Sequence, residues 1–133
     1  MINLDYIAAK YAGKVNVSVE GIENTATSAL NILHEQGIYA LSVWLLEKKE
    51  QNGKANILDG LDSLLLDAQV PFHLIPGQKF SNPDNVREAL TQDLKIMFFA
   101  KDLIELYLIY VRHLAKANPD RKKNNGAFEQ TGR

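Results

Sequence analysis

Few residues in this chain have both the type and the spacing that catalysis or metal binding requires. The histidines are His34, His73 and His113, and none has a second ligand three or four residues away in a known metal-binding pattern. Asp59 and Asp62 are three residues apart and would share one side of a helix, where paired carboxylates can bind a hard cation or transfer protons. A solvated helix surface explains the same pair more simply. We therefore expect no metal ion and no cofactor.

Two further kinds of chemistry lack their motifs. No glycine-rich phosphate loop and no Gly-x-Ser-x-Gly nucleophile motif occurs in the sequence. The chain has no cysteine, which excludes disulfides, cysteine-based zinc sites, iron–sulfur clusters and thiol nucleophiles. A cysteine-free chain suits a reducing compartment, and residues 1–10 lack the basic and apolar regions of a secretory signal. The expected location is therefore cytoplasmic.

Basic residues near the carboxyl end of the chain are a stronger candidate. Arg112, His113 and Lys116 share the polar edge of the last predicted helix, and Lys122 and Lys123 follow it. Cations at this place interact favourably with the helix dipole, which is the ordinary explanation for them. The same strip could instead contact phosphate groups. Composition favours the first explanation and leaves the second open.

The composition is that of one globular domain with no bulk excess of charge. The chain has 133 residues, of which 46% are hydrophobic and 23% are charged, and its formal net charge is −1. A net charge this small excludes a protein that coats nucleic acid by bulk charge, although not one with a local basic patch. We expect a helical domain over residues 1–117 and a flexible, polar and basic tail over residues 118–133.

Apolar residues recur at helical spacing along most of the chain. The predicted helices cover residues 3–12, 22–36, 38–49, 57–65 and 83–117. An unbroken helix over the last range would be roughly 52 Å long, which is too long for a compact domain of this size. We therefore expect either a break near residues 91–93 or a last helix that protrudes from the domain. Residues 94–111 carry too many charges to cross a membrane.

These patterns predict an all-α fold, a compact bundle of five or six helices. Two of the helices are apolar over most of their circumference and need neighbours on several sides. Trp44, Leu45, Phe98 and Leu108 are therefore expected to be buried. The apolar loop over residues 70–82 is expected to pack against the bundle as a strap.

Two segments resemble a known protein family. Residues 29–66 combine an amphipathic helix, a glycine corner at Gly37, an apolar helix that ends in Lys48 and Lys49, a polar turn and a leucine-rich helix. Residues 94–117 form a last helix that closes on a basic pair, an apolar residue and Ala-Lys-Ala. Together they resemble the small α-helical subunit of type III CRISPR effector complexes, most closely that of the Cmr module.

The resemblance implies a non-catalytic RNA-binding subunit with a role in antiviral defence. Its partners would be the other subunits of the complex, further copies of itself, and the phosphate backbone of the guide–target RNA duplex. The residues carried over by position are Arg112, His113 and Lys116, with Lys48 and Lys49 as weaker candidates. Two alternatives stay open, namely a helical interaction or regulatory adaptor unrelated to nucleic acid, and a helical enzyme or small-ligand binder.

Overall fold

Six α-helices and their connections form the described part of the chain, which in this computed structural model comprises residues 3–67, 70 and 79–118. No strand occurs among these residues. The helices are α1 (Leu4–Ala12), α2 (Ile22–Gln36), α3 (Ile38–Leu46), α4 (Lys54–Leu65), α5 (Pro83–Leu90) and α6 (Leu94–Ala117). The all-α prediction is confirmed, and the helix count agrees with it.

Capping side chains set where three of the helices begin. The side-chain oxygen of Asn3 accepts a hydrogen bond from the Tyr6 amide at 3.0 Å, and that of Asn82 accepts one from the Asp84 amide at 3.0 Å. Asp93 accepts from the amides of Lys95 and Ile96 at 2.8 and 3.2 Å. Each cap satisfies backbone donors that have no partner inside the helix. The predicted break before α6 is confirmed, since α5 ends at Leu90 and Asp93 starts the next helix.

A glycine makes the sharp corner between α2 and α3. Gly37 has φ 98° and ψ −177°, a conformation that a residue with a side chain rarely adopts. Its amide donates to the carbonyls of Ile32 and Leu33 and so closes α2. The following residue, Ile38, already belongs to α3. The chain therefore reverses without a loop, which holds α3 against α2.

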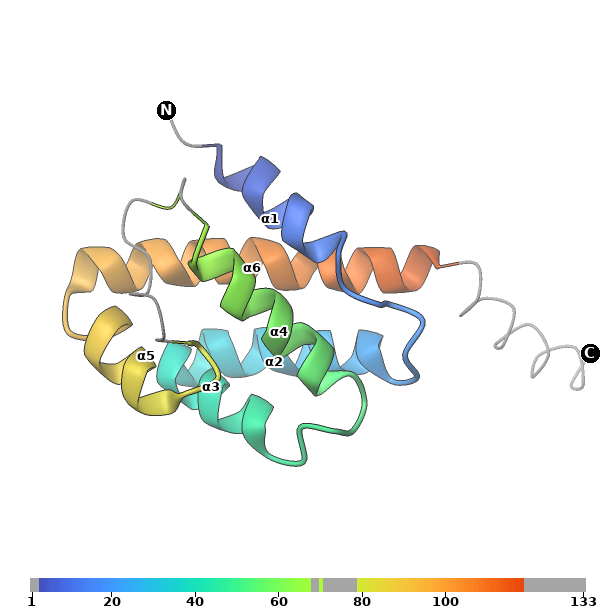
Figure 1. The fold of residues 1–133 in the computed structure, drawn as a ribbon, viewed down its shortest axis with the longest axis horizontal. Coiled ribbons are helices and arrows are strands. Elements are labelled where there is room, and N and C mark those ends of the chain that lie inside the picture. The colour runs from blue at the N-terminus through green and yellow to red at the C-terminus, as the bar shows by residue number, and fades with distance from the viewer. Residues whose placement is uncertain (1–2, 68–69, 71–78, 119–133) are drawn as a thin grey trace, which may run out of the picture.

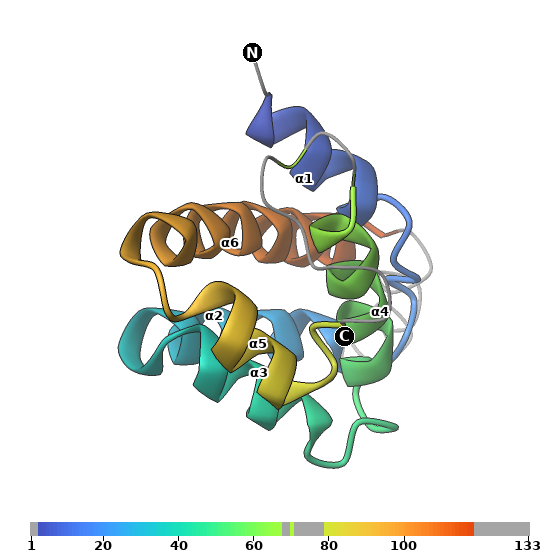
Figure 2. The same cartoon turned by 60° about the vertical axis from the view of Figure 1, so that its left-hand side comes forward.

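The long helix α6 runs through the middle of the bundle. It packs along α2 on one side and α1 on the other, and α3, α4 and α5 complete the bundle (Figures 1 and 2). Ion pairs Glu23–Lys116 and His34–Glu105 join α2 to α6 in antiparallel order. One end of the molecule therefore holds the start of α2, the end of α6 and the α3–α4 turn (Figure 1).

The core follows the predicted apolar stripes with one clear exception. Leu45 and Leu108 are fully buried, as expected. Phe98 was expected to be buried, and this is wrong, because its side chain is 56% exposed. It lies eighteen residues, or five full helical turns, before Lys116, and therefore on the polar edge of α6. Trp44 is only partly buried, since it lines two surface hollows, one between α2 and α3 and one at the start of α2.

A glycine on α4 also makes room for the side chain of Tyr107 from α6. Tyr107 is fully buried, and its hydroxyl donates to the Ile57 carbonyl at 2.8 Å. A Cβ atom on Gly60 would lie 2.1 Å from that hydroxyl oxygen. Only a residue without a side chain leaves room for the tyrosine at this point.

Two predicted segments lie largely outside the described residues. Of the strap over residues 70–82, Val70 and Phe80 are described and both are buried. Of the tail over residues 118–133, only Asn118 is described, and its amide donates to the Ala115 carbonyl. His73, Lys122 and Lys123 are outside the described part of the chain.

Candidate nucleic-acid interface

The five residues named as candidate nucleic-acid contacts occupy three places. Arg112 and Lys116 lie one helical turn apart on the edge of α6 that borders α2. His113 lies on the side of α6 that borders α1, where it lines a groove with Ala9 and Gly13. Lys48 and Lys49 lie in the turn between α3 and α4. The α6 residues therefore do not form one strip, because His113 faces a different neighbour.

The edge of α6 beside α2 carries an ion pair. Lys116 Nζ lies 3.9 Å from Glu23 Oε2, with the lysine side chain 55% exposed and the glutamate 17% exposed. The side chain of Arg112 is partly exposed, and its Nε is buried without a hydrogen-bond partner among the described residues. Both cations therefore remain accessible in part, and one of them has a carboxylate close by.

The prediction that Lys48 and Lys49 end the apolar helix is wrong. Helix α3 ends at Leu46, and Lys48 adopts a left-handed conformation with φ 48° in the turn that follows. The reason is a lysine further along the chain. The ammonium of Lys54 donates to the carbonyls of Trp44 and Glu47 at 3.1 and 2.7 Å, and so occupies acceptors at the end of α3.

The turn after α3 leaves its two lysines fully accessible. Lys48 and Lys49 are exposed, and neither forms an ion pair within the described part of the chain. Lys54, by contrast, packs its ammonium 4.1 Å from the centre of the Trp44 ring. The turn thus presents Lys48 and Lys49 to solvent, whereas Lys54 stabilises the local structure.

The two separate basic groups are each linked to the first turn of α2. Thr25 Oγ1 donates to the Asn52 carbonyl at 2.7 Å, which fastens the α3–α4 turn to the first turn of α2. Glu23, on the same first turn, pairs with Lys116. Lys48 and Lys49 therefore lie on a turn held to one side of the α2 amino terminus, and Arg112 and Lys116 lie on the helix packed against it.

A shallow hollow lies at this helix terminus. It has a volume of about 290 Å³, and its lining residues are Gly21, Asn24, Thr25, Ser28, Trp44, Asn52 and Lys54. The N-cap residue is Gly21, so no side chain caps the helix, and the positive end of the helix dipole faces outward. Backbone amides at such a terminus can bind an anion.

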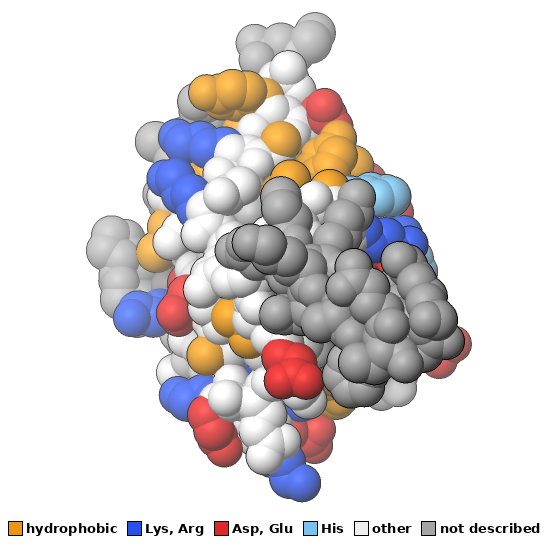
Figure 3. Space-filling view, turned by 90° about the vertical axis from the view of Figure 1, so that its right-hand side faces the viewer, with side chains coloured by type: hydrophobic (Ala, Val, Ile, Leu, Met, Phe, Trp, Pro, Cys, Tyr) orange, Lys and Arg blue, Asp and Glu red, His pale blue; other side chains and the backbone are white. Residues whose placement is uncertain are grey.

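The surface at this end of the molecule is mixed in charge. Figure 3 shows lysine or arginine side chains interspersed with acidic ones on the face viewed from the right-hand side of Figure 1. Glu20, Glu47 and Glu50 are exposed close to the basic residues in sequence. Any anion binding here would therefore depend on a few specific cations rather than on a broad positive field.

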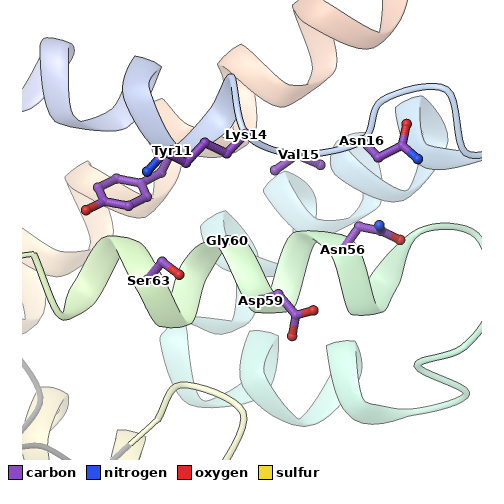
Figure 4. A pocket seen from close by; sticks show the side chains of 8 residues that line it. All are labelled: Tyr11, Lys14, Val15, Asn16, Asn56, Asp59, Gly60 and Ser63. Atoms are coloured by element: carbon purple, nitrogen blue, oxygen red, sulfur yellow. The ribbon is translucent and has the colours of Figure 1, made fainter.

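The carboxylate pair Asp59 and Asp62 does not form a joint site. Asp62 accepts a hydrogen bond from the Ser81 amide at 3.0 Å, and burial raises the pKa of its carboxyl group. Asp59 is exposed and lines a different hollow, of about 240 Å³, between the end of α1 and α4. The side chains around that hollow point in different directions, with Asn16 and Asp59 directed apart (Figure 4). Asp62 fastens the segment before α5, so its role is structural.

The residues that hold these groups in place were not evident from the sequence. Lys54 and Thr25 position the α3–α4 turn through main-chain carbonyls, which any sequence supplies. One sequence signal could have indicated the uncapped start of α2. Gly21 directly precedes an amphipathic helix and has no side chain to cap it. Within the described ranges, no three His, Asp or Glu side chains gather closely enough to hold a metal ion.

Comparison with known proteins leaves the chain without an assigned family. It matches no protein-family model, no curated protein and no solved structure. Among the described helices, none combines the length and low charge that a membrane span requires.

Proposed function

We propose that this chain is a non-catalytic small subunit of a type III CRISPR effector complex and contacts the phosphate backbone of the guide–target RNA duplex. Its partners are the other subunits of the complex and neighbouring copies of itself. The contact does not depend on base sequence, because cations and backbone amides recognise phosphates and not base edges. In this proposal the protein acts in the cytoplasm.

The observation that carries the proposal is the position of the basic residues around the start of α2. Lys48 and Lys49 are exposed on the turn fastened to Thr25, and Lys116 reaches Glu23 on the same helical turn. Cations on two sides of an uncapped helix terminus create a site that favours phosphate. Cations placed only to suit the dipole of α6 would not account for the pair on the α3–α4 turn.

The order of the elements is a second support. The resembling segment at residues 29–66 corresponds to the end of α2, the Gly37 corner, α3, a polar turn and α4, and residues 94–117 correspond to α6. This is the succession of helices that the resemblance implies. The adaptor alternative remains the competing proposal, and it predicts no dependence of binding on these lysines.

The direct test measures how the affinity for RNA changes with salt. The purified chain is titrated with a synthetic RNA duplex of mixed sequence at several salt concentrations. The double variant Lys48→Glu/Lys49→Glu and the single variant Lys116→Glu should each bind more weakly at every salt concentration. The slope of log affinity against log salt should fall by roughly 0.7–0.9 for each lost phosphate contact.

Lys95→Glu is the matched control for Lys116→Glu. Lys95 is an exposed lysine on the same helix, and it lies about 32 Å from Lys116 along the helix axis. The two variants change the net charge equally. Equal losses of affinity in both would show a non-specific charge effect, and unchanged affinity in all variants would favour the adaptor. Tagged protein from the native host should also co-purify with short RNA derived from a CRISPR array.

A further inference from the structure

The connection between α3 and α4 contains a tight turn with asparagine and glycine at its centre. The turn covers residues 51–54, and the Lys54 amide closes it by donating to the Gln51 carbonyl at 3.1 Å. Both central residues are left-handed, Asn52 with φ 57° and Gly53 with φ 78°. Positive φ at both positions is typical of a type I′ turn, which asparagine and glycine adopt most readily. Asn52 is exposed, so its side-chain amide is accessible to water.

Two neighbouring groups in this turn make no hydrogen bond within the described part of the chain. They are the side-chain amide of Asn52 and the backbone amide of Gly53. Gly53 is the N-cap residue of α4, so its N–H group precedes the helical hydrogen-bond pattern. Gly53 also has no side chain to obstruct the approach of another group to its nitrogen. The Gly53 nitrogen and the Asn52 side chain are therefore free to react with each other.

Thr25 contacts the peptide group that contains this nitrogen. Its side chain is buried, and its hydroxyl oxygen lies 2.7 Å from the Asn52 carbonyl oxygen and 3.0 Å from the Gly21 carbonyl oxygen. A hydroxyl has one proton to donate, and the shorter contact receives it. When the Gly53 nitrogen loses its proton, the negative charge is shared with the Asn52 carbonyl oxygen. A donor aimed at that oxygen stabilises the charge, so Thr25 favours the reactive form of the nitrogen.

We infer that Asn52 is a site of spontaneous deamidation and that the fold promotes the reaction. The Gly53 amide loses its proton to hydroxide, and its nitrogen attacks Cγ of Asn52. The bond from this nitrogen to Cγ forms, the Cγ–Nδ2 bond breaks, and Nδ2 leaves as ammonia after taking a proton from water. Water then opens the succinimide ring at either of its carbonyls. Position 52 becomes aspartate or isoaspartate, and in both products a carboxylate replaces a neutral amide.

The new carboxylate arises beside the start of α2. A Cβ atom added to Gly21 would lie 2.9 Å from Asn52 Oδ1, so the Asn52 side chain lies against the N-cap residue of that helix. The helix dipole favours a negative charge at this place, where it competes with phosphate. The carboxylate also adds an acid to the turn that carries Lys48 and Lys49. Deamidation should therefore weaken RNA binding, a consequence that rests on the proposed function, whereas the modification itself does not.

Mass spectrometry of tryptic peptides tests the modification. Trypsin cleaves after Lys49 and Lys54, so peptide 50–54 contains Asn52 as its only asparagine. The full chain is incubated in its folded state at mildly alkaline pH and sampled over time. Peptide 50–54 should gain the mass that separates aspartate from asparagine, and an isoaspartyl methyltransferase should label part of it. Asn56 is the internal control and should stay unmodified, because the amide that follows it donates to the Gly53 carbonyl at 3.0 Å.

Three variants show whether the fold promotes the reaction. Thr25→Val removes the hydroxyl and should slow the conversion of peptide 50–54, whereas Thr25→Ser retains the hydroxyl and should restore the rate. Thr27→Val is the matched control and should leave the rate unchanged, because the Thr27 hydroxyl donates to the Glu23 carbonyl on the same helix.

A fourth variant separates reaction in the folded state from reaction after unfolding. Ile104→Val removes one methyl group from a fully buried side chain and increases the unfolded fraction of the protein. The conversion rate should stay the same in this variant, because the turn reacts while the chain is folded. Circular dichroism confirms that each of the four variants is folded before its rate is compared.

The effect on RNA binding is measured with two substitutions at position 52. Asn52→Asp supplies the charge of the product, and Asn52→Gly supplies a neutral residue, while both are compatible with a left-handed turn. Asn52→Asp should bind the RNA duplex about two- to fivefold more weakly than Asn52→Gly, as expected for one nearby exposed charge. If neither these variants nor the original protein binds RNA, the proposed function is wrong, and the deamidation measured by mass spectrometry still stands.

Three results would overturn the inference. Conversion of peptide 50–54 only in denaturant would show that the turn protects Asn52. Faster conversion in Ile104→Val would show that the chain must unfold before it reacts. Equal rates in Thr25→Val and Thr27→Val would show that the Thr25 hydroxyl does not assist the reaction.

Discussion

The two ends of α6 differ in the face of the helix that carries their apolar side chains. The carboxyl-terminal half packs between α1 and α2, and Tyr107, Leu108 and Val111 there are fully buried. At the amino-terminal end, Leu94 and Phe98 remain exposed. Leu94 lies five full helical turns before Arg112 and Phe98 lies five full turns before Lys116, so both side chains project from the polar edge of α6 and not from its buried face.

This difference assigns different roles to the two ends. At the carboxyl-terminal end, apolar surface is used for folding, and the basic residues at the edge face α2. At the amino-terminal end, Leu94 and Phe98 leave apolar surface in water. One helix thus contributes apolar side chains to the core at one end and to the solvent-exposed surface at the other.

The largest expected effect comes from removing a buried side chain from the carboxyl-terminal half of α6. Leu108→Ala should reduce the free energy of unfolding by about 2–5 kcal/mol, because it removes a fully buried side chain and leaves a cavity. Phe98→Ala should change it by less than about 0.5 kcal/mol, because that ring is already in water. Urea denaturation of both variants measures the contrast. A large loss for Phe98→Ala would mean that the amino-terminal end is covered in solution.

A smaller effect is expected where α6 touches α4. Gly60→Ala should destabilise the protein by about 1–3 kcal/mol, because the added Cβ would lie 2.1 Å from the Tyr107 hydroxyl oxygen. Combining it with Tyr107→Phe should cost less than the sum of the two single changes, since that variant removes the nearest clashing atom. Additive losses in this double-mutant cycle would show that α4 shifts away from Tyr107.

Tyr11 helps to hold α1 in place over the carboxyl-terminal half of α6. Its hydroxyl donates to Asp67 Oδ2 at 2.5 Å and joins α1 to the end of α4. Burial, followed by the bond to Asp67, raises the pKa of Tyr11 to about 12. The protonated form is favoured in the folded state, so this stabilisation is complete below the unfolded pKa of about 10 and is lost as the pH rises through 12.

Tyr11→Phe should therefore reduce stability by about 1.5 kcal/mol at neutral pH, where the hydrogen bond to the carboxylate is intact. Between pH 10 and 12 the original protein should lose more stability than the variant, because only the original has this titration. Tyr107, whose pKa burial also raises, is present in both proteins and cancels in the comparison. Parallel pH profiles for the two proteins would contradict the assignment.

The smallest expected effect is at the ion pair beside α2. Glu23→Gln should change the free energy of unfolding by no more than about 1 kcal/mol, as is usual for a partly exposed pair. It should increase the affinity for an RNA duplex, because it removes a carboxylate that repels phosphate near Lys116. A filter-binding titration measures this, with Glu35→Gln as the control, an exposed glutamate at the opposite end of α2. Reduced affinity would indicate that Glu23 is needed to hold Lys116 in place.

Local signals in the sequence determined much of the architecture. The apolar periodicity predicts the helices, Asn82 and Pro83 mark the start of α5, and the break before α6 follows from length alone. The Gly37 corner is also visible in the sequence, because only glycine adopts its backbone angles without strain. The helix start and the glycine corner depend on residues within about one helical turn of each other, and the break depends only on the length of the predicted segment, so no tertiary contact is needed to predict them.

Tertiary structure alone decided the surroundings of the candidate site. Helix α3 ends three residues earlier than its pattern predicts, because Lys54 reaches back to the carbonyls of Trp44 and Glu47. The end of α6 and the α3–α4 turn are both linked to the start of α2, through Glu23 and Thr25, although they are far apart in the sequence. Phe98 and Leu108 lie about 80° apart around α6, and the packing of α1 and α2 decides which arc of that helix is buried. A residue's spacing determines the face of the helix on which it lies, whereas its burial depends on chain segments far away in the sequence.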